Sequence, residues 1–481
     1  MSLGAKGFLR VSNISQKVAK AEYALQNFYS AQEKRLKDIQ HQNQSSLSDS
    51  IIMSNHCNPH SYGQNPITFN RQCISAILNP DLAKAKIYNQ DVIKRTEYYL
   101  SKLGYPLGAY SEDVGYISVM KNVAKFLEKR DGAVVDHNNI FLTDGVTSGM
   151  NMVLRVLVES PNDAFMIPAP QSPLYGALAA VHNAQSVPYY LNEDKGWEVD
   201  IDELQRIYDK NKEKGVKVKG IFVCNPGNPT GKVMSKEAIQ KIVDFAHRNK
   251  VIILADEVLQ ETIYKDELSF VSLKKIVSEN PDKPVDLFSF YSASNALHGE
   301  GGYRAGFFEV FNLDPEVYDQ LKKLKTMYVC SNTVGQIMVD LMVNPPNRET
   351  NSAEVVEEYE KEKKQIINSL KSKGNILGDC LNSMKNVTCN RIEGGIYVFP
   401  RLHLTEKAIQ KAKTQNMEPD NFYSSEAFEN TGIVLEPGNI FMQVPGTYHY
   451  RFSSLSQSEE GLKKKMEELY NFNEKFQAKY E

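Results

Sequence analysis

Long apolar runs, clustered cysteines and an excess of charge of one sign are all absent from this 481-residue sequence. No apolar run approaches the roughly 18 residues that a membrane-spanning helix needs, so we expect no membrane span. The 56 basic and 59 acidic residues give a formal net charge of −3. The chain therefore lacks the excess of positive charge that is typical of a nucleic-acid-binding protein. The sequence therefore predicts neither a membrane protein nor a nucleic-acid-binding protein.

The six cysteines are scattered, and none of them forms a CxxC pair. This spacing is typical of a reduced intracellular protein rather than of a disulfide scaffold. The N-terminus lacks an apolar signal core, but Lys6, Arg10, Lys17 and Lys20 precede the first acidic residue, Glu22. A basic start of this kind is faintly similar to a mitochondrial address, although an unremarkable basic N-terminus explains it better, and we expect a mitochondrial or a cytoplasmic location.

Hydrophobic residues make up 41% of the chain and charged residues 24%, as in an ordinary globular protein. The length exceeds what one simple core accommodates and predicts two packed domains. We expect an N-terminal arm over residues 1–50 and part of the small domain with a linker over 51–95. A large domain is expected over 96–345 and a small C-terminal domain over 346–481.

From about residue 138, short β-rich apolar runs alternate with helical stretches. The runs are NIFLTDG, AFMIPAP, SVPYYL, GIFVCNPG, VIILADEV, LFSFYSAS and AGFFEVF. Several are apolar on both faces, as buried parallel strands are, so the sequence predicts a mainly parallel, doubly wound α/β sheet. The strand-like and helical segments after residue 345 predict a smaller α+β domain.

Polar motifs follow several of these runs, and ligands of such sheets collect at the carboxyl ends of the strands. The stretch NPGNPTGKV (225–233) must leave the strand irregularly, and ADEV places Asp256 at the end of an apolar strand, where a carboxylate needs a partner. Ser292, Ser294 and Arg304 are available to a phosphate. Gly145 begins a strand-to-helix turn whose amides are suited to an anion.

These motifs occur in an order that resembles the fold-type I aminotransferases that depend on pyridoxal phosphate (PLP), and within them the alanine aminotransferase family. The resemblance covers residues 104–451 and extends back to about 65. It rests on the segments LGAYSEDVG, PAPQSPLY, NPGNPTG, ADEV, GYRAGFFEVFNLDPEV, GGIYVFPR, PGTYHYR and NPITFNRQ.

The resemblance implies a role for each matching position. Asp256 would pair with the pyridine nitrogen of PLP, and Asn228 would bond the phenolic oxygen of the ring. Arg451 would bind the substrate α-carboxylate as a bidentate fork. The phosphate would be held by Gly145, Val146, Thr147, Ser292, Arg304 and, from the other subunit of a dimer, Tyr110.

Four positions depart from the family's pattern. Asn295 occupies the position of the lysine that forms the Schiff base, and an amide can neither form an imine nor act as a base near neutral pH. Leu259 replaces a tyrosine that bonds the ring oxygen, and Ser172 replaces an aromatic residue that stacks on the ring. Cys57 replaces a glycine that lets the backbone approach the substrate. We therefore expect no intact catalytic residue, and PLP binding that is weak or absent and never covalent.

Three functions remain open. The first is an alanine-aminotransferase-like protein that has lost transamination and acts as a structural or regulatory subunit. The second is a working L-alanine:2-oxoglutarate aminotransferase, and the third a sensor that binds PLP or an amino acid. In each case we expect a homodimer or a heterodimer with a related chain, and a larger assembly that contains the dimer stays open.

The stretch HCNPH suggests a separate hypothesis, namely metal binding or thiol catalysis. It places Cys57 between His56 and His60, but no second ligand pair lies nearby in the sequence. We therefore predict no metal site.

Overall fold

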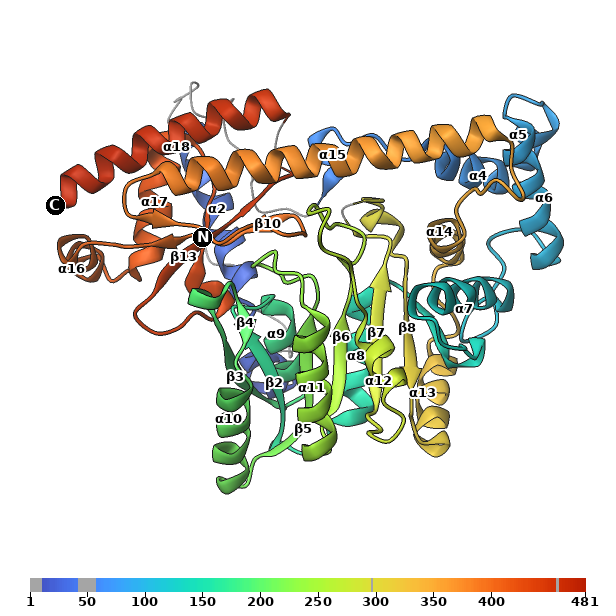
Figure 1. Ribbon diagram of the computed structural model, residues 1–481, viewed down its shortest axis with the longest axis horizontal. Coiled ribbons are helices and arrows are strands. Elements are labelled where there is room, and N and C mark those ends of the chain that lie inside the picture. Colours follow the sequence, from blue (N-terminus) through green and yellow to red (C-terminus); the bar gives the residue numbers. More distant parts are fainter. Residues whose placement is uncertain (1–10, 42–57, 296, 456–457) are drawn as a thin grey trace.

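The computed structural model describes residues 11–41, 58–295, 297–455 and 458–481, and its largest element is an eight-stranded sheet (Figure 1). The strand order is β1-β8-β7-β6-β5-β2-β3-β4. Pairs β2–β3, β2–β5, β5–β6 and β6–β7 are parallel, whereas β8 is antiparallel to both β7 and β1, and β4 to β3. The strands are β1 (Ile140–Thr143), β2 (Asp163–Ala169), β3 (Gln185–Asn192), β4 (Glu198–Val199), β5 (Lys217–Cys224), β6 (Ile252–Asp256), β7 (Leu287–Ser292) and β8 (Gly306–Phe311).

Helices cover both faces of this sheet, which explains why its strands are apolar on both sides. One face packs on α8 (Val146–Leu157), α9 (Pro173–Val181) and α13 (Pro315–Met327). The other packs on α10 (Ile201–Glu213), α11 (Lys236–Asn249) and α12 (Leu273–Glu279). Along β2, Phe165 and Ile167 belong to the first core and Ala164 and Met166 to the second, with the two-residue period of a strand. The predicted doubly wound sheet is confirmed.

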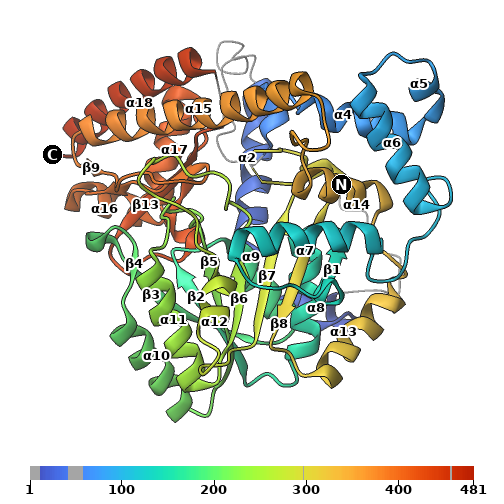
Figure 2. The same ribbon diagram turned by 45° about the vertical axis from the view of Figure 1, so that its right-hand side comes forward.

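A second group of helices lies beyond the β1–β8 edge of the sheet. These are α4 (Thr68–Leu78), α5 (Pro80–Lys84), α6 (Gln90–Leu103), α7 (Ile117–Asp131) and α14 (Thr333–Val343). Helices α7 and α14 lie side by side (Figure 2), and the group forms a core that also contains Leu142 and Phe307 of the sheet.

The smaller sheet is five-stranded and antiparallel, and its core is separate from those of the large sheet. Its strands are β9 (Val387–Thr388), β10 (Tyr397–Val398), β11 (Arg401–Leu402), β12 (Glu436–Pro437) and β13 (Tyr448–Ser453). The surrounding helices are α15 (Ala353–Ser383), α16 (Glu406–Thr414), α17 (Pro419–Thr431) and α18 (Glu459–Tyr480). The predicted smaller α+β unit is therefore also confirmed.

Helix α15 spans both parts of the molecule (Figure 1). Its first half contributes Val355 and Tyr359 to the core of the α4–α7 group, and its second half contributes Leu370 and Leu377 to the core of the small sheet. Because one helix belongs to two cores, the residue boundaries predicted for the domains stay predictions.

The described part of the N-terminal arm forms two helices, α1 (Gln16–Lys20) and α2 (Ala24–His41). Between them the backbone is extended at Ala21, which separates the two helices. Leu25 of α2 is buried against Trp197, Phe399 and Phe441, which brings the arm to the junction of the two sheets. In the described residues no helix is both long and apolar enough to cross a bilayer.

Candidate active site

The carboxyl ends of the central strands bring most of the predicted site residues to one edge of the large sheet. Asp256 ends β6 and Ser292 ends β7, whereas Gly145 and Asn228 follow β1 and β5. The ends of β5 and β6 are joined by a hydrogen bond from the Asn225 amide to the Asp256 carbonyl, of 3.0 Å. This is the edge at which ligands of doubly wound sheets bind.

Gly145 and Arg304 form a cradle at the first turn of α8. Gly145 caps that helix with a φ of +81°, and a Cβ placed there would lie 2.7 Å from Nη2 of Arg304. The Arg304 guanidinium is exposed and donates to the carbonyls of Asp144 (3.3 Å) and Gly301 (3.1 Å). Val146 and Thr147 supply the first helical amides, so a cation and a helix N-terminus meet where no side chain intervenes. This arrangement suits an anion such as a phosphate.

Ser292 lies behind this cradle. Its side chain is fully buried, and its hydroxyl hydrogen-bonds with that of Ser294 at 2.6 Å. Gly306 on the neighbouring strand gives it room, since a Cβ there would lie 3.0 Å from the Ser292 Cβ and 3.1 Å from the Gly145 Cα. The structure thus brings Gly145, Ser292 and Arg304 together.

Asp256 already has a side-chain partner within the chain. Tyr175 of α9 donates its hydroxyl proton to Oδ2 at 2.7 Å, and the Val258 amide donates to Oδ1 at 3.3 Å. The Tyr175 ring stacks on Phe222, with centroids 4.7 Å apart. Burial raises the pKa of Asp256, although the hydrogen bonds from Tyr175 and Val258 lower it in part. Sequence reasoning missed Tyr175, because its position opposite Asp256 depends on how α9 packs on the sheet.

Arg451 and Asn228 are in contact, and Arg451 is paired with a carboxylate of its own chain. Nη1 of Arg451 donates to Oδ1 of Asn228 at 3.0 Å, and Nε donates to Oε2 of Glu436 at 2.5 Å. The guanidinium carbon lies 4.0 Å from the ring centroid of Tyr397 and 4.6 Å from that of Phe441. Burial alone would lower the pKa of Arg451, but the charge of Glu436 outweighs it and the pKa is raised.

Sequence reasoning also missed Glu436, although the sequence carries a signal for it. The residue lies in the apolar stretch GIVLEPG, and a charge at such a place requires a buried partner.

The side chain of Asn295 is buried and is used to hold its own turn. Its Nδ2 donates to the Ser292 carbonyl (2.9 Å), the Tyr291 hydroxyl (3.2 Å) and Sδ of Met342 (3.5 Å). Its Oδ1 accepts from the His298 amide at 2.9 Å. The amide is therefore satisfied by the protein itself, with 1% of the residue exposed.

A charged cluster adjoins this turn. The Tyr291 hydroxyl donates to Glu261, which forms an ion pair with Lys363 at 3.0 Å. Burial would raise the pKa of Glu261, but Lys363 lowers it below its ordinary value. Burial lowers the pKa of His298 to about 4, against the opposing influence of Glu261.

The remaining predicted positions differ in their surroundings. Leu259 is buried and would lie 3.3 Å from a Cβ on Gly395 of the small-sheet domain. Ser172 precedes α9 as its N-cap without a side-chain capping bond, and Tyr110 is 75% exposed. Cys57 and His56 lie outside the described residues. Within the described ranges, no three His, Cys, Asp or Glu side chains are grouped to hold a metal ion.

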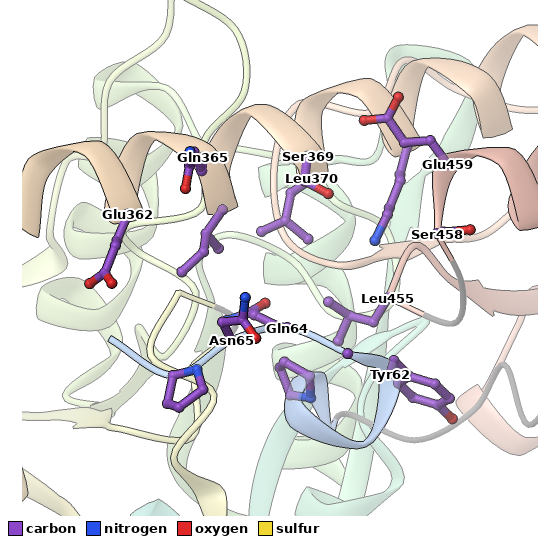
Figure 3. A pocket seen from close by; sticks show the side chains of 15 residues that line it. Tyr62, Gln64, Asn65, Glu362, Gln365, Ser369, Leu370, Leu455, Ser458 and Glu459 are labelled. Atoms are coloured by element: carbon purple, nitrogen blue, oxygen red, sulfur yellow. The ribbon is translucent and has the colours of Figure 1, made fainter. Parts of the chain in front are cut away.

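A cavity of about 530 Å³ lies between α15, the segment 59–66 and the start of α18 (Figure 3). Gln64, which lines it, donates to the Leu297 carbonyl at 3.1 Å, so the cavity adjoins the turn that contains Asn295. Among the described residues, its lining includes Glu362 and Lys373 but none of the positions predicted to bind cofactor or substrate.

Comparisons with known proteins agree with this geometry. The family model described as aminotransferase class I and II matches residues 79–462. The chain is 37% identical over 478 residues to the mitochondrial alanine aminotransferase 1 of Arabidopsis thaliana, an alignment that covers 98% of this chain and 87% of the relative. It is also 37% identical to glutamate–glyoxylate aminotransferase 1 of the same plant, with 90% of each chain covered. The solved structure of an alanine aminotransferase from Pyrococcus furiosus superposes with a TM-score of 0.74 at 19% identity, covering 96% of this chain and all of that one.

Proposed function

Because the chain belongs to the aminotransferase class I and II family, we propose that it is an alanine-aminotransferase-like protein that has lost transamination and acts as a structural or regulatory subunit. The observation that carries this proposal is the state of Asn295. The position that the resemblance assigns to the Schiff-base lysine holds an amide whose nitrogen and oxygen are both hydrogen-bonded within the turn. No amine is present there to form an imine or to move a proton.

The cofactor of this family is PLP, and the residues of this chain fit it only in part. Gly145, Arg304 and the first amides of α8 would hold its phosphate, and Asp256 would pair with its ring nitrogen. The covalent link is lacking at Asn295, and Ser172 offers no ring to stack on. We therefore propose that PLP binds weakly and without a covalent bond.

A second function, a sensor that binds PLP, is favoured by one observation. The Gly145–Arg304 cradle keeps its exposed guanidinium and its open helix N-terminus although the residues around Asn295 have changed. A working L-alanine:2-oxoglutarate aminotransferase is favoured by the names of the relatives alone.

The exposed apolar side chains near the cradle support a dimer. Tyr110 and Met327 are 75% and 69% exposed, and Tyr328 follows directly. A hydrogen bond of 2.6 Å from Thr326 to Asp113 joins the two segments. We propose that this surface, defined by Tyr110 and residues 327–329, packs against a second copy or a related chain.

A mitochondrial location is proposed from the basic N-terminus and the relatives named as mitochondrial.

An assay of pyruvate release from L-alanine and 2-oxoglutarate, with PLP in excess, tests the loss of transamination. We expect a rate at least about 10³-fold below the roughly 10 per second of a typical enzyme. A rate near that typical value would overturn the proposal and favour the working aminotransferase.

A further inference from the structure

Glu436 and Arg451 face each other across two neighbouring strands of the small sheet. Glu436 of β12 is the register partner of Arg451 of β13, so both side chains leave the same face of the sheet. Both are buried, with 0% of the Glu436 side chain and 5% of the Arg451 side chain exposed. The pair is therefore held by backbone pairing as well as by its Nε–Oε2 contact of 2.5 Å.

The guanidinium has the surroundings of a carboxylate site. The guanidinium carbon lies 4.0 Å from the ring centroid of Tyr397 and 4.6 Å from that of Phe441. Asn228 accepts a hydrogen bond from Nη1 of Arg451. A planar cation that packs on aromatic rings is suited to a carboxylate in its plane. Glu436 supplies such a carboxylate from within the chain.

Helix α2 of the N-terminal arm completes the contact. The Tyr29 hydroxyl donates to Oε1, the second oxygen of Glu436, at 2.9 Å. Leu25, one turn earlier, is buried against Trp197, Phe399 and Phe441. Burial and the neighbouring Glu436 raise the pKa of Tyr29, so its hydroxyl keeps the proton that it donates.

We propose that Glu436 is an internal carboxylate ligand of Arg451 that excludes α-amino and 2-oxo acids from this arginine. The inference rests on the proposed function only in taking Arg451 as the residue that would bind a substrate carboxylate. An incoming carboxylate must displace Glu436, which leaves a buried charge without its partner. Affinity for such ligands is lowered on the order of 10²–10³-fold by this displacement.

The test compares 2-oxoglutarate binding to the full chain and to a Glu436→Gln variant by calorimetry or ligand-observed NMR. The glutamine has the same shape and no charge, so we expect it to bind 2-oxoglutarate at least about 100-fold more tightly than the unaltered chain. Adding Arg451→Gln must abolish that gain. Tyr29→Phe, which removes one hydrogen bond to Glu436 and leaves the ion pair, is the matched control and should gain less than about 10-fold.

Equal affinity of the unaltered chain and Glu436→Gln would overturn the inference, as would a gain that persists without Arg451. If Glu436→Gln does not fold, the unaltered chain and Arg451→Gln still test the inference. Tight binding of 2-oxoglutarate by the unaltered chain, abolished by Arg451→Gln, would show that Glu436 does not exclude the ligand. The two proposals fail separately. Alanine turnover with a much lower KM in Glu436→Gln would contradict only the loss of activity, whereas tight 2-oxoglutarate binding by the unaltered chain without turnover would contradict only the role of Glu436.

Discussion

The side chain of Asn295 is part of the local hydrogen-bond network, because it bonds to Ser292, Tyr291 and the His298 amide. A longer side chain at this position must give up these contacts. The groups that surround it, among them the Tyr291 hydroxyl and the Sδ of Met342, are arranged around an amide. The local structure around position 295 therefore fits an asparagine side chain.

We predict that Asn295→Lys alone does not restore alanine transamination. Leu259 and Ser172 still lack the donor and the ring that the family pattern provides, and misplacement of a reacting group by about 1 Å costs on the order of 10²-fold in rate. Pyruvate release should stay at least about 10²-fold below that of a variant that also carries Leu259→Tyr, Ser172→Tyr, Cys57→Gly and Glu436→Gln. Turnover near 10 per second by the single variant would identify Asn295 as an isolated lesion.

His298 gives a pH dependence whose sign follows from its lowered pKa. The folded-state pKa of about 4 lies below the ordinary value of 6.5, so between these pH values the unfolded chain binds a proton that the folded chain does not. Stability therefore falls as the pH drops from 6.5 to 4, by up to about 3 kcal/mol from this residue.

We predict that His298→Met removes this contribution and also the buried Nε2, which has no hydrogen-bond partner. Urea unfolding at pH 7.5 and at pH 5 measures the effect. The variant should lose less free energy of unfolding between the two pH values than the unaltered chain. Equal losses would show that His298 takes up its proton in the folded state.

The elements were largely predictable, because strands buried on both faces have a distinctive sequence. FMIPA is apolar throughout and FSFYS is aromatic at three of its five positions, and these segments belong to the central strands β2 and β7. Contacts between short elements, or between elements far apart in the sequence, could not be predicted. The pairing of Glu436 with Arg451 depends on the register of β12, a strand of two residues. A strand of that length has no periodicity to detect.

The junction between the two sheets depends on Gly394. Its amide donates to the Gly231 carbonyl at 2.9 Å, and a Cβ there would lie 2.6 Å from the carbonyl oxygen of Thr262. We predict that Gly394→Ala lowers the free energy of unfolding by about 1–3 kcal/mol, because backbone atoms must move apart. Gly302→Ala is the control, since a Cβ at Gly302 meets no atom within 4 Å. Equal melting temperatures of the two variants would contradict the close approach.

The surface of Tyr110 and residues 327–329 gives a prediction for the assembly of two chains. Met327→Glu places a charge in the proposed interface and should shift the chain toward a monomer in analytical ultracentrifugation. Val134→Glu alters a side chain outside this surface that is 89% exposed and should leave the dimer intact. A monomer at all concentrations, or dissociation by both variants, would contradict the proposed surface.

The overall architecture followed from the alternation of apolar runs and helices together with the family resemblance, whereas the interior of the site did not. The motifs and the resemblance predict Asp256 and Arg451 as site residues, yet no sequence pattern indicates that Tyr175 donates to Asp256. Such contacts depend on how helices and short strands pack, which a local pattern does not record.

The proposed loss of transamination requires that this chain forms no covalent bond with PLP. The intact mass after incubation with PLP, removal of the free cofactor and reduction with borohydride measures this. We predict an unchanged mass, because Asn295 offers no amine to form an imine that borohydride could reduce. A stoichiometric gain of one pyridoxyl phosphate group, mapped to a lysine near the strand ends, would contradict it.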